Sequence, residues 1–240
     1  MSFDRRLPIS RGFLWGVGTK IFVYNEDRIP PSGAAVFVSN HRSFMDAPLL
    51  MAASGRPINF VCHHYMTRVP GLREFVDAFG CLPLEPNDRP QHRFFRKALR
   101  CLQQQQAIGI FPEGASSMVQ MSAANELAPF NPGFAHLALS APVDELALIP
   151  VAIASVEETV YSPLPVRMLS WFDPSEPYFQ QDGWHPIVIY RRVNLLFGRP
   201  RWISRSRRQG DRPSFDKTAI EQLNADCYGE IDRLLRRGCY

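Results

Sequence analysis

Two side chains that can take part in proton transfer, His41 and Asp46, lie in one short stretch between two apolar runs. The first run ends near Ser39 and predicts a buried strand, and the second begins at Ala47 and predicts a helix. An aspartate that holds a neutral histidine in one tautomer makes it a usable general base near neutral pH. Five residues on a continuous helix turn through about 500°, so the pair meets only if His41 lies in the loop and Asp46 opens the helix. The alternative is that Asp46 simply caps the helix as its N-cap and His41 is an ordinary loop residue.

The composition is that of an ordinary globular chain with one sizeable domain. The 240 residues are 45% hydrophobic and 21% charged, and the formal net charge of +4 is modest. The five cysteines include no Cys-x-x-Cys pair and are odd in number, which favours reduced thiols over a disulfide framework or a zinc site. No apolar run approaches the ~20 residues of a transmembrane helix, and no signal-peptide core follows Arg5 and Arg6. Membrane-spanning and disulfide-rich secreted classes are therefore disfavoured.

Apolar runs and helical periodicities alternate along the chain. Strands are expected over 34–39, 58–62, 81–84, 107–111, 146–154 and 187–197. Helices are expected over 46–54, 72–79, 91–106, 133–140 and 215–236. This alternation predicts an α/β fold, a single domain with a central mixed sheet flanked by helices.

Three stretches depart from the regular alternation. Residues 9–24 are aromatic and broken by glycines, and predict an irregular helix that either contacts a membrane or packs on the core. Pro150 inside the central strand predicts a bulge or a break, and residues 155–185 predict a long Pro-rich excursion with short strands. The chain is accordingly divided into an N-terminal amphipathic and aromatic helical membrane-contact segment at 1–30, a core at 31–200, and a basic loop with a C-terminal helix packed on the core at 201–240.

Two further features can carry chemistry. Glu113 lies in a Pro-Glu-Gly turn at the end of the 107–111 strand, where a buried carboxylate is costly unless it has a partner. It is therefore either a site residue or an exposed turn residue. Arginines cluster between residues 199 and 212, where they can bind phosphate groups or an anionic membrane surface, or simply form a solvated loop.

Three turns, taken in order, resemble the motifs of a known family. Asn-His-Arg-Ser-Phe-Met-Asp at 40–46 resembles the NHxSxxD box, an H-x4-D motif, of the glycerolipid acyltransferases related to 1-acyl-glycerol-3-phosphate acyltransferase. Phe-Pro-Glu-Gly at 111–114 resembles their FPEG box, and Leu-Ile-Pro-Val at 148–151 resembles their block around a proline. Phe-Asn-Pro-Gly-Phe-Ala at 130–135 and Leu-Phe-Gly-Arg-Pro at 196–200 are similar to later family segments. Each motif is short, but both boxes together, in order and at strand ends, make the resemblance specific.

The resemblance spans about residues 30–200 and implies acyl transfer from acyl-CoA or acyl-carrier protein to the hydroxyl of a lysolipid. It implies that His41 is the general base and that Asp46 orients it and stabilises the imidazolium. Backbone N–H groups at the start of the first helix are expected to stabilise the oxyanion. The implied substrate-binding residues are Asn40, Ser43, Glu113 and Gly114. No metal and no cofactor is expected beyond the acyl donor, which is a co-substrate.

This chain lacks two arginines that resemble phosphate ligands in family members acting on a glycerol phosphate. Ser116 stands where the FPEG box commonly continues with arginine, and Pro86 stands at the arginine of a GxxFxxR-like block. Arg89 or Arg93 can replace them as phosphate ligands from nearby positions. The alternative is an acceptor without a phosphate, such as a lyso-amino-acid lipid or a glycolipid.

Other functional classes fit the sequence less well. A serine hydrolase would need a G-x-S-x-G elbow, which the chain lacks, and a nucleic-acid partner is not expected without stacking motifs. A relative that binds lipid or acyl carrier but has lost activity is the second alternative. The expected partners are a membrane lipid surface and acyl-CoA or acyl-carrier protein, at the cytoplasmic face of a membrane, with peripheral or monotopic attachment. The sequence does not indicate an oligomeric state.

Overall fold

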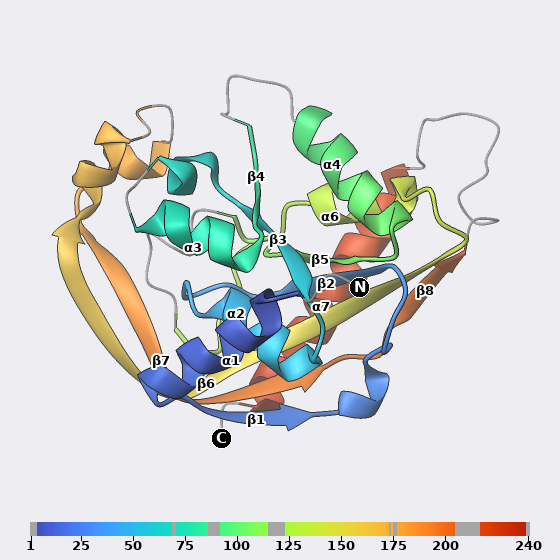
Figure 1. The fold of residues 1–240 in the computed structure, drawn as a ribbon, viewed down its shortest axis with the longest axis horizontal. Helices are drawn as coiled ribbons and strands as arrows, with labels where there is room; N and C mark the ends of the chain where they lie inside the picture. The colour runs from blue at the N-terminus through green and yellow to red at the C-terminus, as the bar shows by residue number, and fades with distance from the viewer. Residues whose placement is uncertain are drawn as a thin grey trace.

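A mixed sheet forms the centre of the molecule, and a long hairpin within it reverses the strand direction (Figure 1). The computed structural model describes residues 4–68, 71–85, 92–114, 123–172, 174, 177–204 and 217–238. The strands are β1 (Lys20–Tyr24), β2 (Ala35–Ser39), β3 (Ile58–Cys62), β4 (Leu82–Pro83), β5 (Ala107–Ile110), β6 (Glu145–Pro165), β7 (Trp184–Phe197) and β8 (Arg201–Ser204). Their order is β1-β7-β6-β2-β5-β3-β4, and β8 also pairs with β6. β6 is antiparallel to β7 and β8, and the other pairs are parallel.

Helices cover both faces of this sheet. They are α1 (Arg6–Val17), α2 (Asp46–Ser54), α3 (Leu72–Phe79), α4 (His92–Gln103), α6 (Gly133–Ser140) and α7 (Lys217–Gly238). Ala35 and Phe37 of β2 face a core shared with α1, α2 and α3, and Val36 and Val38 face the opposite core, shared with α4, α6 and α7. Successive side chains of a strand point to opposite faces, so a continuous apolar run serves a strand that is covered on both sides. The predicted α/β domain with a mixed sheet flanked by helices is confirmed.

The N-terminal segment is not the irregular helix expected over residues 9–24. α1 ends at Val17, and Gly18 closes it with a left-handed φ of 76° that favours glycine. The chain then forms β1, which pairs in parallel with β7 at the edge of the sheet, because residues such as Ile21 and Val23 favour an extended backbone. α1 packs against α2. No helix in the described ranges combines the length and apolarity that crossing a bilayer requires.

The excursion expected over residues 155–185 is mostly a two-stranded arm. β6 continues to Pro165, β7 begins at Trp184, and the strands pair along the arm with register shifts near Glu157 and between Tyr161 and Leu164. Two short 3-10 helices, η3 (Val166–Trp171) and η4 (Pro177–Gln180), close its end. The arm projects on the left of Figure 1. Alternating β-branched and aromatic residues keep this stretch extended, since such side chains fit a pleated surface.

Pro150 does not produce the bulge or break expected within the central strand. β6 continues through Pro150, which pairs with Val38 of β2. On its other side β8 pairs with β6 up to Leu148 and β7 pairs from Val151. The proline nitrogen therefore falls at the junction between two partner strands, where the ladder needs no donor, and its carbonyl accepts the N–H of Gly198 at 2.8 Å.

Candidate active site

Two neighbouring parallel strands bring His41 and Glu113 to one edge of the sheet. β2 pairs with β5 from Ala35 through Val38, and each strand ends just before one of the two turns. Because parallel strands present their carboxyl ends at the same edge, turns that lie 72 residues apart in the sequence meet in space.

His41 and Asp46 form a hydrogen-bonded pair at this edge. Nδ1 of His41 lies 2.8 Å from Oδ2 of Asp46, whose side chain is fully buried, whereas 17% of the His41 side chain is exposed. Asp46 Oδ2 also accepts the backbone N–H groups of Arg42 at 2.8 Å and Ser43 at 2.9 Å. The carboxylate thus organises the whole loop and, by accepting from Nδ1–H, leaves the lone pair of His41 on Nε2.

One expectation for this turn needs correction. Asp46 is not the N-cap of α2; Met45 occupies that position without a side-chain cap, and Asp46 is the first helical residue. The Asp46 carboxylate instead accepts the N–H groups of Arg42 and Ser43 in the preceding loop, because buried N–H groups require acceptors. Stabilisation of an oxyanion by N–H groups at the start of α2 stays a prediction.

Two stacked aromatic rings hold the His41 imidazole in place. The Phe111 ring lies 4.2 Å from the imidazole at an interplanar angle of 12°. The Phe60 ring of β3 stacks on Phe111 at 5.6 Å and 8°. In the described part of the chain no hydrogen bond involves Nε2 of His41, and His41 lines a pocket. The lone pair of the base is therefore open to a substrate hydroxyl.

Glu113 is a buried residue of the site, so it is not the exposed turn residue that the sequence left open. Its Oε1 accepts the N–H of His41 at 2.8 Å, and its Oε2 accepts the N–H of Ala128 at 2.8 Å. Burial raises the pKa of Glu113 above its ordinary value, and the two backbone hydrogen bonds offset part of that effect. Glu113 joins the His41 loop to the segment before α6; its contact with an acceptor stays a prediction.

Asn40 and Ser43 bind the His41 loop to the β6–β7 hairpin. The Asn40 side chain donates to the carbonyl of Ile153 at 2.9 Å and accepts its N–H at 2.8 Å. Ser43 Oγ donates to the carbonyl of Val188 at 2.6 Å and accepts the N–H of Met45 at 3.1 Å. These hydrogen bonds shape the turn, and substrate contact by either side chain stays a prediction.

An ion pair that the sequence did not indicate joins the same loop to the arm. Nη1 and Nη2 of Arg42 donate to the two carboxylate oxygens of Glu158 at 2.8 and 3.0 Å, and only 5% of the Arg42 side chain is exposed. Burial raises the pKa of Glu158, but the hydrogen bonds from Arg42 and Ser155 and the positive charge of Arg42 together hold that pKa below its ordinary value. The sequence could not predict this ion pair, because Arg42 occupies a variable position of the NHxSxxD box and Glu158 lies 116 residues away.

Glu158→Gln is expected to destabilise the fold by about 3 kcal/mol, because it leaves the Arg42 charge buried without its counter-charge. A depressed carboxylate pKa contributes stability above the pKa of the unfolded chain, and this contribution is lost as the pH falls below about 4.5 through the folded value. Urea unfolding at pH 7 and in acid measures both effects. The matched control is Glu157→Gln, an exposed neighbour; equal losses in the two variants would contradict the role of the pair.

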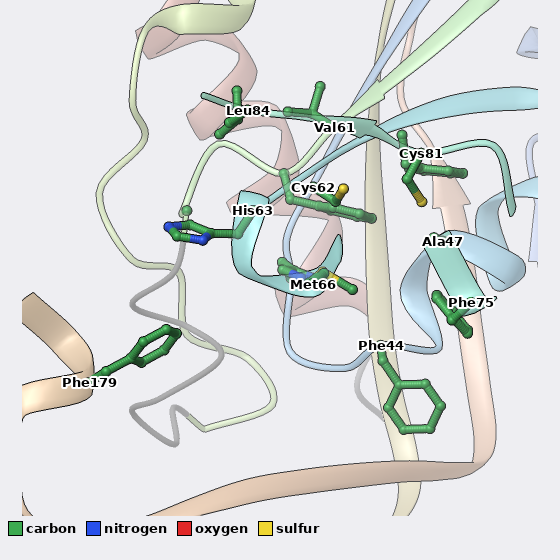
Figure 2. A pocket seen from close by; sticks show the side chains of 14 residues that line it. Phe44, Ala47, Val61, Cys62, His63, Met66, Phe75, Cys81, Leu84 and Phe179 are labelled. Atoms are coloured by element: carbon green, nitrogen blue, oxygen red, sulfur yellow. The ribbon is translucent and has the colours of Figure 1, made fainter. Parts of the chain in front are cut away.

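His41 opens into an apolar pocket of about 130 Å³. Figure 2 shows Phe44 and Phe75 on one side of it and Phe179 on another, near His63 and Met66. Phe179 comes from the end of the arm, where it packs with Val166, Leu169, Met66 and Leu72. The lining residues are His41, Phe44, Ala47, Phe60, Val61, Cys62, His63, Met66, Phe75, Cys81, Leu84, Phe111, Gly114 and Phe179. Such a pocket, apolar with one base at its wall, can hold a hydrocarbon chain beside a reacting group.

Of the remaining predicted site residues, one lines the pocket, one lies away from it, and one lies outside the described residues. Gly114 lines the pocket with a left-handed φ of 70°, a conformation that favours glycine. Arg93 is exposed on α4 and does not line the pocket. Arg89, Pro86 and Ser116 lie outside the described residues, so the phosphate-binding role of Arg89 stays a prediction.

Comparisons with known proteins identify the family of the chain. The chain matches the protein family described as Acyltransferase over residues 20–154, which is more than half of its length. The chain therefore belongs to the acyltransferase family.

Two known proteins are similar to this chain, one in sequence and one in fold. It is 26% identical over 102 residues to the 1-acyl-sn-glycerol-3-phosphate acyltransferase of Borreliella burgdorferi; the match covers 42% of this chain and only 41% of the relative. Its fold is similar to the crystal structure of the 1-acyl-sn-glycerophosphate (LPA) acyltransferase, PlsC, from Thermotoga maritima, with a TM-score of 0.59 and 15% identity over 96% of this chain and 77% of that one. The resemblance read from the sequence motifs is confirmed.

Proposed function

We propose that this acyltransferase moves a fatty acyl group from acyl-CoA or acyl-carrier protein to the hydroxyl of a lysolipid, with His41 as general base. The observation that carries the proposal is the His41–Asp46 pair with Nε2 open to an apolar pocket. The H-x4-D and FPEG boxes and the family membership support it. Asp46 orients the imidazole and stabilises the imidazolium.

The reaction balances with no covalent acyl-enzyme. Nε2 of His41 takes the proton from the acceptor hydroxyl as its oxygen attacks the thioester carbonyl. The tetrahedral intermediate collapses, the C–S bond breaks, and the imidazolium returns the proton to the departing thiolate. The acyl chain lies in the apolar pocket during these steps.

We propose a 1-acyl-glycerol-3-phosphate-like acceptor first, and an acceptor without a phosphate as the alternative. The alternative is favoured by one observation: none of the residues that line the described pocket is arginine or lysine. A lyso-amino-acid lipid or a glycolipid would not need such a cation.

The test is acyl transfer by the purified chain. Labelled acyl-CoA and acyl-carrier protein are supplied in parallel with lysophosphatidic acid, other lysophospholipids, lyso-ornithine lipid and lysoglycolipids. Transfer that disappears in His41→Ala supports the proposal, and the acceptor used decides between the two candidates. Absence of transfer from every donor and acceptor pair would favour an inactive lipid-binding relative.

We also propose that the protein works at a membrane surface, on its cytoplasmic face, and takes its acceptor from the lipid. All four tryptophans of the chain are exposed, although this large side chain is usually mostly buried. Three of them are Trp15 of α1 (87% exposed), and Trp171 (77%) and Trp184 (60%) of the arm. We propose that these three rings form one membrane-facing surface, which we name the tryptophan surface. Exposed Arg191 of β7 donates to the carbonyl of Val17 at the end of α1, which links the two parts. Tryptophan rings beside arginine suit the boundary of an anionic bilayer.

The double variant Trp15→Ala/Trp171→Ala is expected to bind vesicles of phosphatidylcholine and phosphatidylglycerol about tenfold more weakly, because two rings no longer enter the interface. Vesicle flotation measures the binding, and added salt should weaken it further. Trp202→Ala, which removes an exposed ring of β8 elsewhere on the molecule, is the control. Unchanged binding in the double variant would rule out this surface.

A further inference from the structure

A second hollow lies on the side of the sheet covered by α7, and it shares no lining residue with the apolar pocket. It encloses about 740 Å³ between three parts of the chain: α7, the junction between β7 and β8, and the short helix η1 (Glu26–Arg28). Five arginines line it, namely Arg28, Arg199, Arg201, Arg233 and Arg237. We name it the arginine groove.

The walls of the arginine groove are held in place by close packing. A Cβ atom on Gly198 would lie 2.8 Å from Cγ of Pro150 and 3.0 Å from Cγ of Glu230, so α7 sits directly against the strand junction. Arg28 is anchored from the opposite side, since its Nη1 donates to the carbonyl of Phe197 at 2.9 Å. A Cβ on Gly229, by contrast, would meet no atom within 4 Å, which leaves room on the α7 side.

The charges around the arginine groove do not cancel. Asp226 pairs with Arg201 at 2.7 Å, and Glu230 pairs with Arg233 at 2.7 Å. These are the two carboxylates that line the groove. Arg28 bonds only to a carbonyl, and Arg199 and Arg237 have no ion pair or hydrogen bond within the described residues. Three guanidinium charges therefore face the groove in excess.

Helix electrostatics explains only part of this set. Arg233 and Arg237 lie near the C-terminus of α7, where the helix dipole favours cations. Arg28 and Arg199 come from two other elements, and nothing in α7 accounts for them. Guanidinium groups that converge from three elements without enough carboxylates are suited to a polyanion, because each presents a planar fork that matches phosphate oxygens.

We propose that the arginine groove binds a phosphate-bearing ligand larger than a lone phosphate ion. Its volume lies within the range of pockets that hold cofactor-sized molecules, about 300–1,000 Å³. The excess of three charges matches a ligand with a phosphate monoester or several phosphate groups. The same chemistry is offered by the headgroup of an acidic lipid and by a soluble nucleotide such as CoA, and the test separates these sources. The site is independent of His41 and of the acyl-transfer step.

The experiment measures binding by the full chain, without turnover. Inorganic phosphate, glycerol 3-phosphate and CoA are titrated calorimetrically, and phosphatidylcholine vesicles with and without phosphatidic acid are tested by flotation. The test variant is Arg199→Gln/Arg237→Gln, which breaks no ion pair of the described structure. The control is Arg96→Gln/Arg236→Gln, which removes the same charge from α4 and from a helical position that pairs with Asp232 outside the groove.

We expect the test variant to bind the phosphate probe at least about tenfold more weakly, while the control variant keeps its affinity and both keep acyl-transfer activity. Loss in the test variant of a CoA site separate from that of the acyl donor supports a soluble ligand, and loss of phosphatidic acid binding alone supports a lipid headgroup. Equal weakening in the two variants, or no binding of any probe by the unaltered chain, would overturn the proposal.

Discussion

Replacing His41 with alanine is expected to lower the rate of acyl transfer by about 10³-fold, because the acceptor hydroxyl then loses its base. Within the described residues, the His41 side chain makes one hydrogen bond, to Asp46, and stacks on Phe111. It is also partly exposed. Its removal should therefore leave the fold nearly as stable as before, so that the loss appears in kcat and not in the amount of folded protein.

Steady-state transfer with the best donor and acceptor pair measures the effect, beside thermal unfolding of each variant. His63→Ala is the matched control, since His63 lines the same pocket without the Asp46 contact. We expect it to keep transfer within about tenfold. If His41→Ala and His63→Ala lost activity equally, proton abstraction by His41 would have to be abandoned.

Asp46→Asn tests whether the pair acts as a unit. The amide oxygen can take the place of Oδ2 and keep the three hydrogen bonds from the loop, so the variant loses mainly the negative charge. We expect kcat to fall by about 10²-fold because the imidazolium is no longer stabilised. In the double variant with His41→Ala, the losses should not add, since a carboxylate without its histidine has nothing to orient.

Local sequence signals were sufficient for most of the elements and for the central pair. α2 and α3 end at the predicted glycines, and α6 begins at the predicted Pro-Gly pair, because each helix carries its own boundary signals. His41 and Asp46 lie five residues apart, so a strand end and a helix start were enough to bring them together. The prediction of one irregular helix over residues 9–24 was wrong because Gly18 ends α1. The strand that follows, β1, depends on pairing with β7, which is distant in the sequence.

The contacts that support the site could not be read from the sequence. Asn40 bonds to Ile153, Ser43 to Val188 and Arg42 to Glu158, and each partner lies more than 110 residues further along the chain. These partners all come from the β6–β7 hairpin. Ile153 and Val188 lie in strands that the sequence predicted, whereas Glu158 lies in the stretch that was expected to be an irregular excursion. Even where the strands were predicted, no local pattern could show which of their residues contact the His41 loop. The long-range contacts that position His41 could therefore be identified only from the three-dimensional structure.

Gly109→Ala is expected to destabilise the protein by about 2 kcal/mol and to lower transfer by about 10²-fold, although Gly109 touches no substrate. Gly109 pairs with Phe37 on one side and Phe60 on the other in the middle of the sheet. A Cβ atom there would lie 2.3 Å from Cε1 of Phe60 and 2.4 Å from its Cδ1, far inside contact distance. The Phe60 ring is 1% exposed, so it can yield only toward the pocket that it lines and toward the Phe111 ring stacked on it.

Displacement of the Phe60 ring by the new methyl group should also move His41, because three rings are stacked one on the next. Phe60 lies on Phe111, and Phe111 lies on the His41 imidazole. The control is Gly133→Ala at the start of α6, where a Cβ would meet no atom within 4 Å and alanine favours the helix. Urea unfolding and kcat are measured for both variants. A loss of stability without a loss of kcat would mean that the stack fills space without positioning His41. Recovery of kcat in Gly109→Ala/Phe60→Leu, where a smaller side chain makes room for the new methyl group, would show that the ring transmits the effect.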